Sequence, residues 1–98
     1  MSTPEGRVKA AIKVVLKRVG MYYHMPVVNG MGAPSLDFVG CLRGRFVAIE
    51  AKAPGEKPTK RQTQTRNEMT DAGAIVLLVR SVEEARELET TLNLLVPL

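Results

Sequence analysis

The chain has few of the residues that build redox sites and transition-metal sites. Its 98 residues include one cysteine, Cys41, one histidine, His24, and no tryptophan. A single cysteine excludes an internal disulfide and a multi-cysteine metal site, and His24 has no second histidine or cysteine with which to bind a metal. We expect Cys41 to be an inert residue buried in a strand, and His24 to be structural or exposed to solvent.

Long hydrophobic runs are also missing. No apolar stretch approaches the roughly 20 residues that cross a bilayer. The start, Met-Ser-Thr-Pro-Glu, lacks the basic and apolar segments of a secretion signal. We therefore expect a soluble, cytoplasmic protein with no membrane partner. A chain of this length is sufficient for one modest hydrophobic core, so residues 1–98 are expected to form a single domain.

The charges are divided unevenly along the chain. Residues 1–66 contain twelve lysines and arginines against four acids, whereas residues 67–98 contain two against six. A basic region of this size suits a polyanionic partner such as nucleic acid. The acidic remainder is expected to face away from that partner.

Local signals predict the element order α, β, β, β, α, β, α. Thr3 and Pro4 suit the start of a first helix that ends at Gly20, Thr59 suits the start of a second helix, and Ser81 suits the start of a third. Strands are expected over residues 21–28, 38–42, 46–49 and 74–79, the last of them central, and residues 93–98 are expected to add an edge strand or to pack on a partner subunit. This order predicts an α/β fold, a mixed sheet flanked by helices, with a right-handed crossover through the second helix.

The hairpin around Arg43-Gly44 carries the candidate site. A two-residue loop there places Asp37 opposite Glu50, with Lys52 two residues on and on the same face. Two directly opposed acids are destabilising unless a cation lies between them or one is protonated, so this face needs a functional explanation. The other face of the hairpin is apolar and suits packing against a helix: Leu36, Phe38, Leu42, Val47, Ile49 and Ala51.

Mg²⁺ and Mn²⁺ prefer oxygen ligands of the kind that this face supplies. Asp37 and Glu50 provide carboxylates, and the backbone carbonyl of Ala51 and the carboxylate of Glu5 are further candidates. Glu5 lies within the apolar arc of the first helix. Either it is a first-turn glutamate in solvent, favoured by the helix dipole, or it reaches inward to a metal or to Lys52.

The second helix, residues 59–73, is very polar for a helix that packs on a sheet. Its best inward stripe is Gln62, Thr65, Met69 and Ala72. It is either a solvated surface helix or the cover of a wet, charged site. In the second case Gln62 would hold a water molecule or a phosphate, and Lys52 would orient or deprotonate an attacking water or neutralise the transition state.

Five short motifs together resemble a known family. Pro34–Asp37, Glu50–Lys52 and Thr59–Gln62 resemble the motifs of the PD-(D/E)xK nuclease superfamily. Gly73–Val76 and Val79–Ser81 are similar to its VRR-NUC branch, which includes small stand-alone phage proteins. Ser35 and Leu36 separate Pro34 from Asp37, so the literal Pro-Asp pair of the first motif is interrupted, and the closing motif is Val-Arg-Ser in place of Val-Arg-Arg. On its own, the Glu-x-Lys pattern is also typical of a surface ion pair.

The resemblance implies a restriction-endonuclease-like αβββαβ core with an extra C-terminal helix, and a site with Mg²⁺ or Mn²⁺. It implies metal-dependent hydrolysis of phosphodiester bonds by a homodimer acting on branched DNA, such as a Holliday junction or a flap, without sequence specificity and in the host cytoplasm if the protein is phage-encoded. Asp37 and Glu50 become metal ligands, Lys52 the catalytic lysine, Gln62 the helix glutamine and Glu5 the N-terminal helix acid. The residues expected to bind DNA are basic: Lys9, Lys13, Arg43, Arg45, Lys57, Lys60, Arg61 and Arg66.

The competing hypothesis is a non-catalytic module. Such a protein would keep the nuclease fold and use its basic face to hold DNA or RNA.

Overall fold

The computed structural model describes residues 3–27 and 34–98. Within them the elements follow the predicted order: α1 Pro4–Val19, β1 Tyr22–His24, β2 Phe38–Leu42, β3 Arg45–Ala51, α2 Lys60–Asp71, β4 Ile75–Val79 and α3 Val82–Leu95. The strands form one mixed sheet in the order β1-β2-β3-β4. β2 is antiparallel to both β1 and β3, whereas β4 is parallel to β3. The predicted fold class is confirmed.

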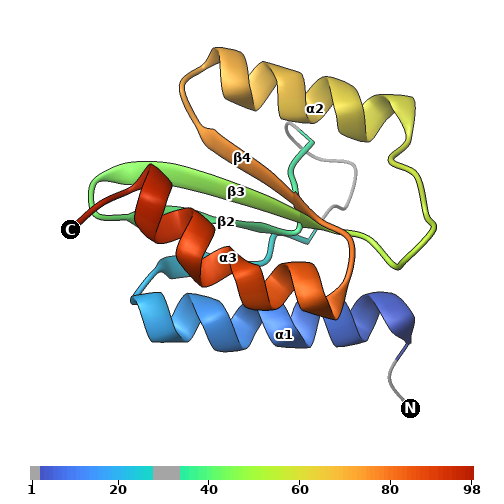
Figure 1. The fold of residues 1–98 in the computed structure, drawn as a ribbon. Coiled ribbons are helices and arrows are strands. Elements are labelled where there is room, and N and C mark those ends of the chain that lie inside the picture. The colour runs from blue at the N-terminus through green and yellow to red at the C-terminus, as the bar shows by residue number, and fades with distance from the viewer. Residues whose placement is uncertain (1–2, 28–33) are drawn as a thin grey trace.

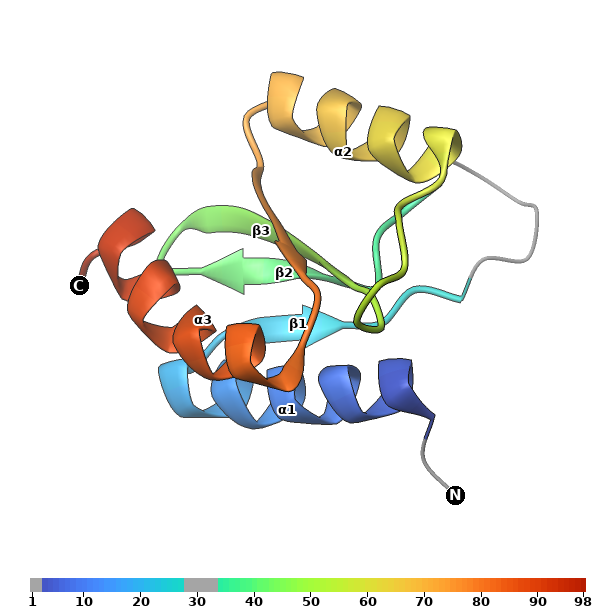
Figure 2. The same ribbon diagram turned by 45° about the vertical axis from the view of Figure 1, so that its right-hand side comes forward.

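The helices divide between the two faces of the sheet. α1 and α3 lie side by side on one face, and α2 lies alone on the other, as Figure 1 and the turned view in Figure 2 show. α2 connects β3 to the parallel strand β4, so it forms the predicted crossover. None of the helices in the described residues is long and apolar enough to cross a membrane.

The turn at Arg43-Gly44 fixes the register of the β2–β3 hairpin. Both residues have positive φ angles, 50° and 84°, as a two-residue turn of the type I′ class requires. Phe38 therefore lies opposite Ile49, and Leu42 lies opposite Arg45, which confirms the predicted register.

The helix starts follow from local hydrogen bonds. The side chain of Thr3 accepts a hydrogen bond from the Gly6 amide at 2.9 Å, and Gly20 ends α1 in the left-handed conformation with φ of 80°. The hydroxyls of Thr59 and Ser81 cap α2 and α3 in the same way. All four predicted signals are confirmed.

The core on the α1 and α3 side is large and apolar. Phe38, Leu42, Val47, Ile49 and Ala51 project from the sheet into it, as the alternation of the hairpin predicted. The helices supply the rest: Val8, Ile12, Val15 and Leu16 from α1, and Ala85, Leu88 and Leu92 from α3. The cluster on the α2 side is much smaller and has three buried members, Leu36, Val39 and Ala48, with Met69 and Val76 packed against them.

Three predictions about the strands are wrong. β1 ends at His24, because the chain leaves the sheet before Pro26, and residues 28–33, which include most of the predicted glycine-rich turn, lie outside the described residues. β4 is an edge strand and not a central one in the described part of the chain, and most of it is only half-buried. Residues 93–95 complete α3 and Val96 packs into the core, so they form no edge strand.

Other predictions fail on side-chain exposure. Cys41 is exposed and not buried: it lies on the α2 side of the sheet, where the apolar cluster is small, and Phe46, its partner across the β2–β3 ladder, is 48% exposed. Leu36 packs on the α2 side and not with Phe38, because the chain bends at Asp37 before β2 begins. Ala72 follows the last helical residue of α2 and is exposed. His24 is exposed, as expected.

Candidate active site

Glu50 is the most unusual residue at the site. It lies near the end of β3, on the face toward α2, and only 2% of it is exposed. Both of its carboxylate oxygens are buried and have no hydrogen-bond partner among the described residues. The Nε atom of Arg66, on α2, lies 3.8 Å from Oε1 and is itself buried without a hydrogen bond. An acid in this position is costly unless a cation lies beside it.

Burial raises the pKa of Glu50 above the ordinary value for a glutamate. The positive charges of Arg66 and Lys52 act in the opposite direction, and the negative charges of Asp37 and Glu5 add to the increase. Desolvation outweighs the two cations. The side chain is therefore short of positive charge in the protein alone.

Asp37 lies at a bend immediately before β2, one residue beyond the last ladder pair, Phe38 with Ile49. Its Oδ2 accepts a hydrogen bond from the Ala51 amide at 2.8 Å, so the side chain takes the place of a backbone acceptor at the end of the ladder. Its Oδ1 lies 3.7 Å from the ammonium group of Lys9 on α1. The hydrogen bond holds Asp37 at the end of β3 that carries Glu50.

Lys52 directly follows β3 and is 7% exposed. Its amide donates a hydrogen bond to the carbonyl oxygen of Val79 at 2.9 Å, which ties the residue to the end of β4. Its positive charge lowers the pKa of Glu50, which precedes it by two residues at the end of β3.

Glu5 joins the site through an ion pair. Its Oε2 lies 3.2 Å from the ammonium group of Lys9, which also faces Asp37. Lys9 therefore links two acids from different elements. The side chain is half-exposed and paired with Lys9, and the two alternatives for Glu5, an acid in solvent or an inward ligand, both stay predictions.

Gln62 lies in the first turn of α2 and closes a capping box. Its Oε1 accepts a hydrogen bond from the Thr59 amide at 2.9 Å, and the Thr59 hydroxyl accepts one from the Gln62 amide at 3.1 Å. A hollow of about 270 Å³ opens beside it, lined by Pro34, Ser35, Thr59, Arg61, Gln62 and Thr65. This hollow joins the segment that leads into Asp37 to the start of α2, and hydroxyl and guanidinium groups line it.

Most of the basic residues expected to bind DNA are either exposed or half-buried within the site. Lys13, Lys57, Lys60 and Arg61 are exposed, the last two in the first turn of α2. Lys9 and Arg66 are half-buried within the site itself.

Arg43 and Arg45 lie at the far end of the hairpin, about 20 Å from Asp37 at the usual rise per residue of a strand. Arg43 donates hydrogen bonds to the Val96 carbonyl oxygen at 2.6 Å and to the Asn93 side chain at 3.2 Å, so it fastens the end of α3 to the hairpin.

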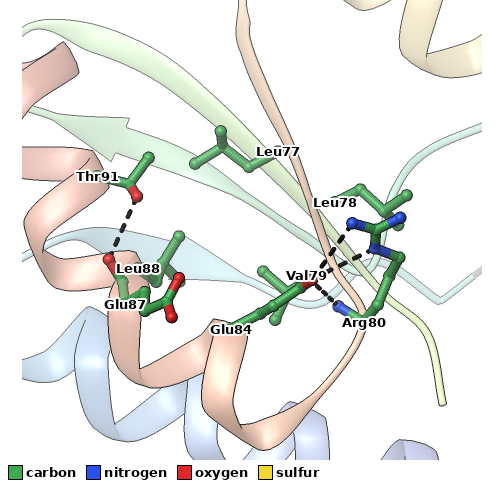
Figure 3. A pocket seen from close by; sticks show the side chains of 8 residues that line it. All are labelled: Leu77, Leu78, Val79, Arg80, Glu84, Glu87, Leu88 and Thr91. Atoms are coloured by element: carbon green, nitrogen blue, oxygen red, sulfur yellow. Dashed lines mark hydrogen bonds and ion pairs between the residues drawn. The ribbon is translucent and has the colours of Figure 1, made fainter. Parts of the chain in front are cut away.

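Val79 and Arg80 have structural roles that the sequence did not reveal. A hollow of about 230 Å³ lies between β4 and α3, and Figure 3 shows Arg80 beside Glu84 at its rim. The Arg80 amide donates a hydrogen bond to Glu84 Oε1 at 2.8 Å, and the guanidinium group lies 3.3 Å from Oε2. The hydrogen bond from the Arg80 amide holds the pKa of Glu84 below its ordinary value. Arg80 thus stabilises the start of α3, while Val79 positions Lys52.

The ion-pair partners of the acids are not evident from the sequence motifs. Lys9 and Arg66 are predicted to bind DNA, and the structure places them against Asp37 and Glu50, respectively. Helical spacing contains a signal for both. Lys9 is four residues after Glu5, and Arg66 is four residues after Gln62, so each shares a helix face with a residue already assigned to the site.

The donor set fits a divalent cation of the oxygen-binding type. The two orphaned oxygens of Glu50 are buried acceptors in need of a positive charge, and Asp37 offers a second carboxylate. In the described residues no three histidine, cysteine or acidic side chains gather as a metal-binding group. Two carboxylates with water and phosphate to complete the shell are the ligands that Mg²⁺ commonly takes.

Comparisons with known proteins support the fold. The sequence matches no model of a known family, and no curated protein matches it. Among solved structures it is similar to one described as "VRR_NUC domain", with a TM-score of 0.74 and 24% sequence identity over 89% of this chain and 95% of that chain. The fold expected from the sequence motifs is thereby confirmed, and this chain has the fold of a VRR_NUC domain.

Proposed function

We propose that this chain is a metal-dependent nuclease that hydrolyses phosphodiester bonds in DNA. The observation that carries the proposal is the buried carboxylate of Glu50, whose oxygens have no hydrogen-bond partner in the described chain and which lies beside Asp37 and Lys52. Buried, unsatisfied charge of this kind is rare in a folded protein and is typical of functional sites. The VRR_NUC fold supports a nuclease in particular.

Asp37 and Glu50 would hold a Mg²⁺ or Mn²⁺ ion, with the Ala51 carbonyl as a further ligand. A bound ion of this type lowers the pKa of a water ligand and stabilises negative charge on a phosphate. The hydrogen bond from the Ala51 amide to Oδ2 restricts the orientation of the Asp37 side chain. Its other oxygen, Oδ1, would then bind the ion.

Lys52 would act on the attacking water. Its amide is held by the Val79 carbonyl oxygen, and its ammonium group would orient the water and neutralise charge on the phosphate as the bond to the leaving oxygen breaks. Gln62 and Arg61 line the adjoining hollow, so a phosphate of the same strand would fit there. With Lys60 they would contact the backbone without selecting a sequence.

Branched DNA and a homodimer are the finer parts of the proposal. Exposed apolar residues near the end of α3, Leu94 at 77% and Leu95 at 47%, support a self-association surface. Two active sites related by twofold symmetry would suit the two strands of a junction.

A second function is favoured by one observation. Each acid at the site has a cation of the same chain beside it, with Lys9 facing Glu5 and Asp37, and Arg66 facing Glu50. The site is thus partly neutralised without a metal, as a non-catalytic DNA-binding module would require.

Cleavage assays separate the two functions. Purified protein is incubated with fluorescent four-way junction, flap, splayed and linear DNA in Mg²⁺ or Mn²⁺. We expect cleavage, strongest on branched DNA, and its loss in Lys52→Ala. Lys17→Ala is the matched control, because Lys17 is an exposed lysine of α1 outside the site. Absence of cleavage on all substrates, or full activity of Lys52→Ala, rejects the catalytic proposal.

A metal titration separates them independently. The nuclease proposal expects Mn²⁺ to bind the wild-type protein and not the Asp37→Asn, Glu50→Gln double variant. The binding-module proposal expects no Mn²⁺ binding to either protein and unchanged DNA binding in both.

A further inference from the structure

Arg66 differs from the other basic residues near the site. Its Nε atom is buried, has no hydrogen-bond partner among the described residues, and lies 3.8 Å from Glu50 Oε1. Lys60 and Arg61, on the same helix, are exposed. A guanidinium nitrogen and a carboxylate that are both buried, close, and not hydrogen-bonded form a pair with charge attraction and no fixed geometry.

We infer that Arg66 is a built-in counter-ion that a divalent cation displaces from Glu50. The inference rests on the proposed metal-dependent function and adds a competition within that site. Arg66 and the metal would neutralise the same carboxylate, because both Glu50 oxygens are buried and the Arg66 guanidinium lies against one of them. The metal-free protein then keeps a buried acid without unfolding, and the metal binds more weakly than the acids alone would allow.

The position of Arg66 on α2 allows this exchange. The helix packs on the sheet through the small cluster around Met69 and Val76, and Arg66 lies one turn before Met69. Within residues 3–27 and 34–98, its Nη2 makes one long contact, to Thr63 Oγ1 on its own helix at 3.5 Å. A pair at 3.8 Å without a hydrogen bond gives up little directional bonding when the guanidinium moves away.

Calorimetric titration with MnCl₂ tests the competition. Arg66→Met should bind Mn²⁺ on the order of tenfold more tightly than wild type. The free-energy change that corresponds to this ratio is about a third of the attraction between two unit charges at this separation near a protein surface. Lys17→Met is the control: it removes one exposed positive charge outside the site, and its Mn²⁺ affinity should stay within about twofold of wild type, as expected for an exposed charge screened by salt.

The outcomes distinguish this inference from the proposed function. If wild type and Arg66→Met bind Mn²⁺ equally, or Arg66→Met binds more weakly, the competition is rejected while the metal site remains. If neither protein binds Mn²⁺, both the competition and the metal-dependent function are rejected. Tighter binding by Arg66→Met supports the competition even where wild-type binding is too weak to measure.

Thermal unfolding in EDTA provides a second readout that needs no metal. Arg66→Met should lower the melting temperature in the wild-type background, because Glu50 loses its counter-ion. The same substitution should cost much less in a Glu50→Gln background, which is also the variant most certain to fold without Arg66. Equal losses in the two backgrounds would show that the charges of Arg66 and Glu50 do not interact, and would overturn the inference.

Discussion

The two faces of the sheet differ in what their inward side chains do: one face forms most of the apolar core, and the other carries a buried acid. On the side of α1 and α3, the inward residues of the hairpin join a continuous apolar cluster with both helices. On the side of α2, the same strands offer Val39 and Ala48 and then Glu50, and the apolar cluster is small. One face therefore supplies most of the hydrophobic stabilisation, and the other can bear a buried charge that a fully apolar core would not tolerate.

The largest expected effect tests whether stability resides on the α1 and α3 face. Ile12 is fully buried there, so Ile12→Ala should lower the free energy of unfolding by about 2–5 kcal/mol. Met69, on the α2 face, is only half-buried, and Met69→Ala should cost about 1 kcal/mol. Urea unfolding followed by circular dichroism measures both. Similar losses of unfolding free energy in Ile12→Ala and Met69→Ala would show that the two faces contribute equally to stability.

The next effect concerns activity on the α2 face. Glu50→Gln removes the charge and keeps the size of the side chain, so cleavage should fall roughly 10²- to 10³-fold, comparable to the cost of removing one preorganised hydrogen-bond donor that stabilises a transition state. Initial rates on a labelled junction substrate measure the change. An active Glu50→Gln protein would show that the buried acid serves the fold and not the chemistry.

The same variant should have the opposite effect on stability. Burial raises the pKa of Glu50, so the folded protein favours the protonated form. Below about pH 4.3, the ordinary pKa of a glutamate, the residue is protonated in both states and its charge costs nothing. As the pH rises through the raised pKa of folded Glu50, the buried carboxyl group must ionise. The free energy of unfolding then falls, because a buried charge is less favourable than the same charge in the unfolded chain.

Glu50→Gln should therefore match wild type near pH 4 in EDTA and become the more stable of the two toward pH 7.5. Urea unfolding of both proteins across that range measures the difference, and groups other than Glu50 cancel to a first approximation. A difference that does not grow with pH would contradict the burial cost. Adding Mn²⁺ at pH 7.5 should reverse the order, because only wild type gains from binding.

The smallest expected effect concerns the far end of the hairpin. Arg43→Gln should lower the free energy of unfolding by about 1–2 kcal/mol, because the hydrogen bonds to Val96 and Asn93 are lost. Arg45, its exposed neighbour, is the control, and Arg45→Gln should stay within about 0.5 kcal/mol of wild type. Equal losses would mean that Arg43 does not fasten α3 to the hairpin.

The sequence predicted those features of the fold that depend on interactions between residues close together in the chain. The caps at Thr3, Thr59 and Ser81, the apolar stripe of α1, and the register set by Arg43-Gly44 each depend on residues within a few positions of one another. The same alternation placed Glu50 and Lys52 on the α2 side, away from the apolar hairpin residues.

The errors have a different origin. That β4 lies at the edge and that Cys41 is exposed depend on where elements distant in sequence end, and alternation does not contain that information. The pairing of Lys9 with Asp37 and of Arg66 with Glu50 depends on long side chains, whose direction is set only when helices and sheet are packed. The sequence therefore contains the candidate acids but does not reveal which cations lie against them.

The exposure of Cys41 has a practical consequence. Because it is the sole cysteine in the sequence and lies on an open part of the sheet, it offers one thiol for maleimide dyes or nitroxide spin labels without mutagenesis. It lies four residues from Asp37, about 13 Å at the usual strand rise, within range for paramagnetic broadening by Mn²⁺. The same thiol can also link two chains by air oxidation. Mass measurements of the native assembly should therefore contain a reductant, so that a covalent artefact is not mistaken for a dimer.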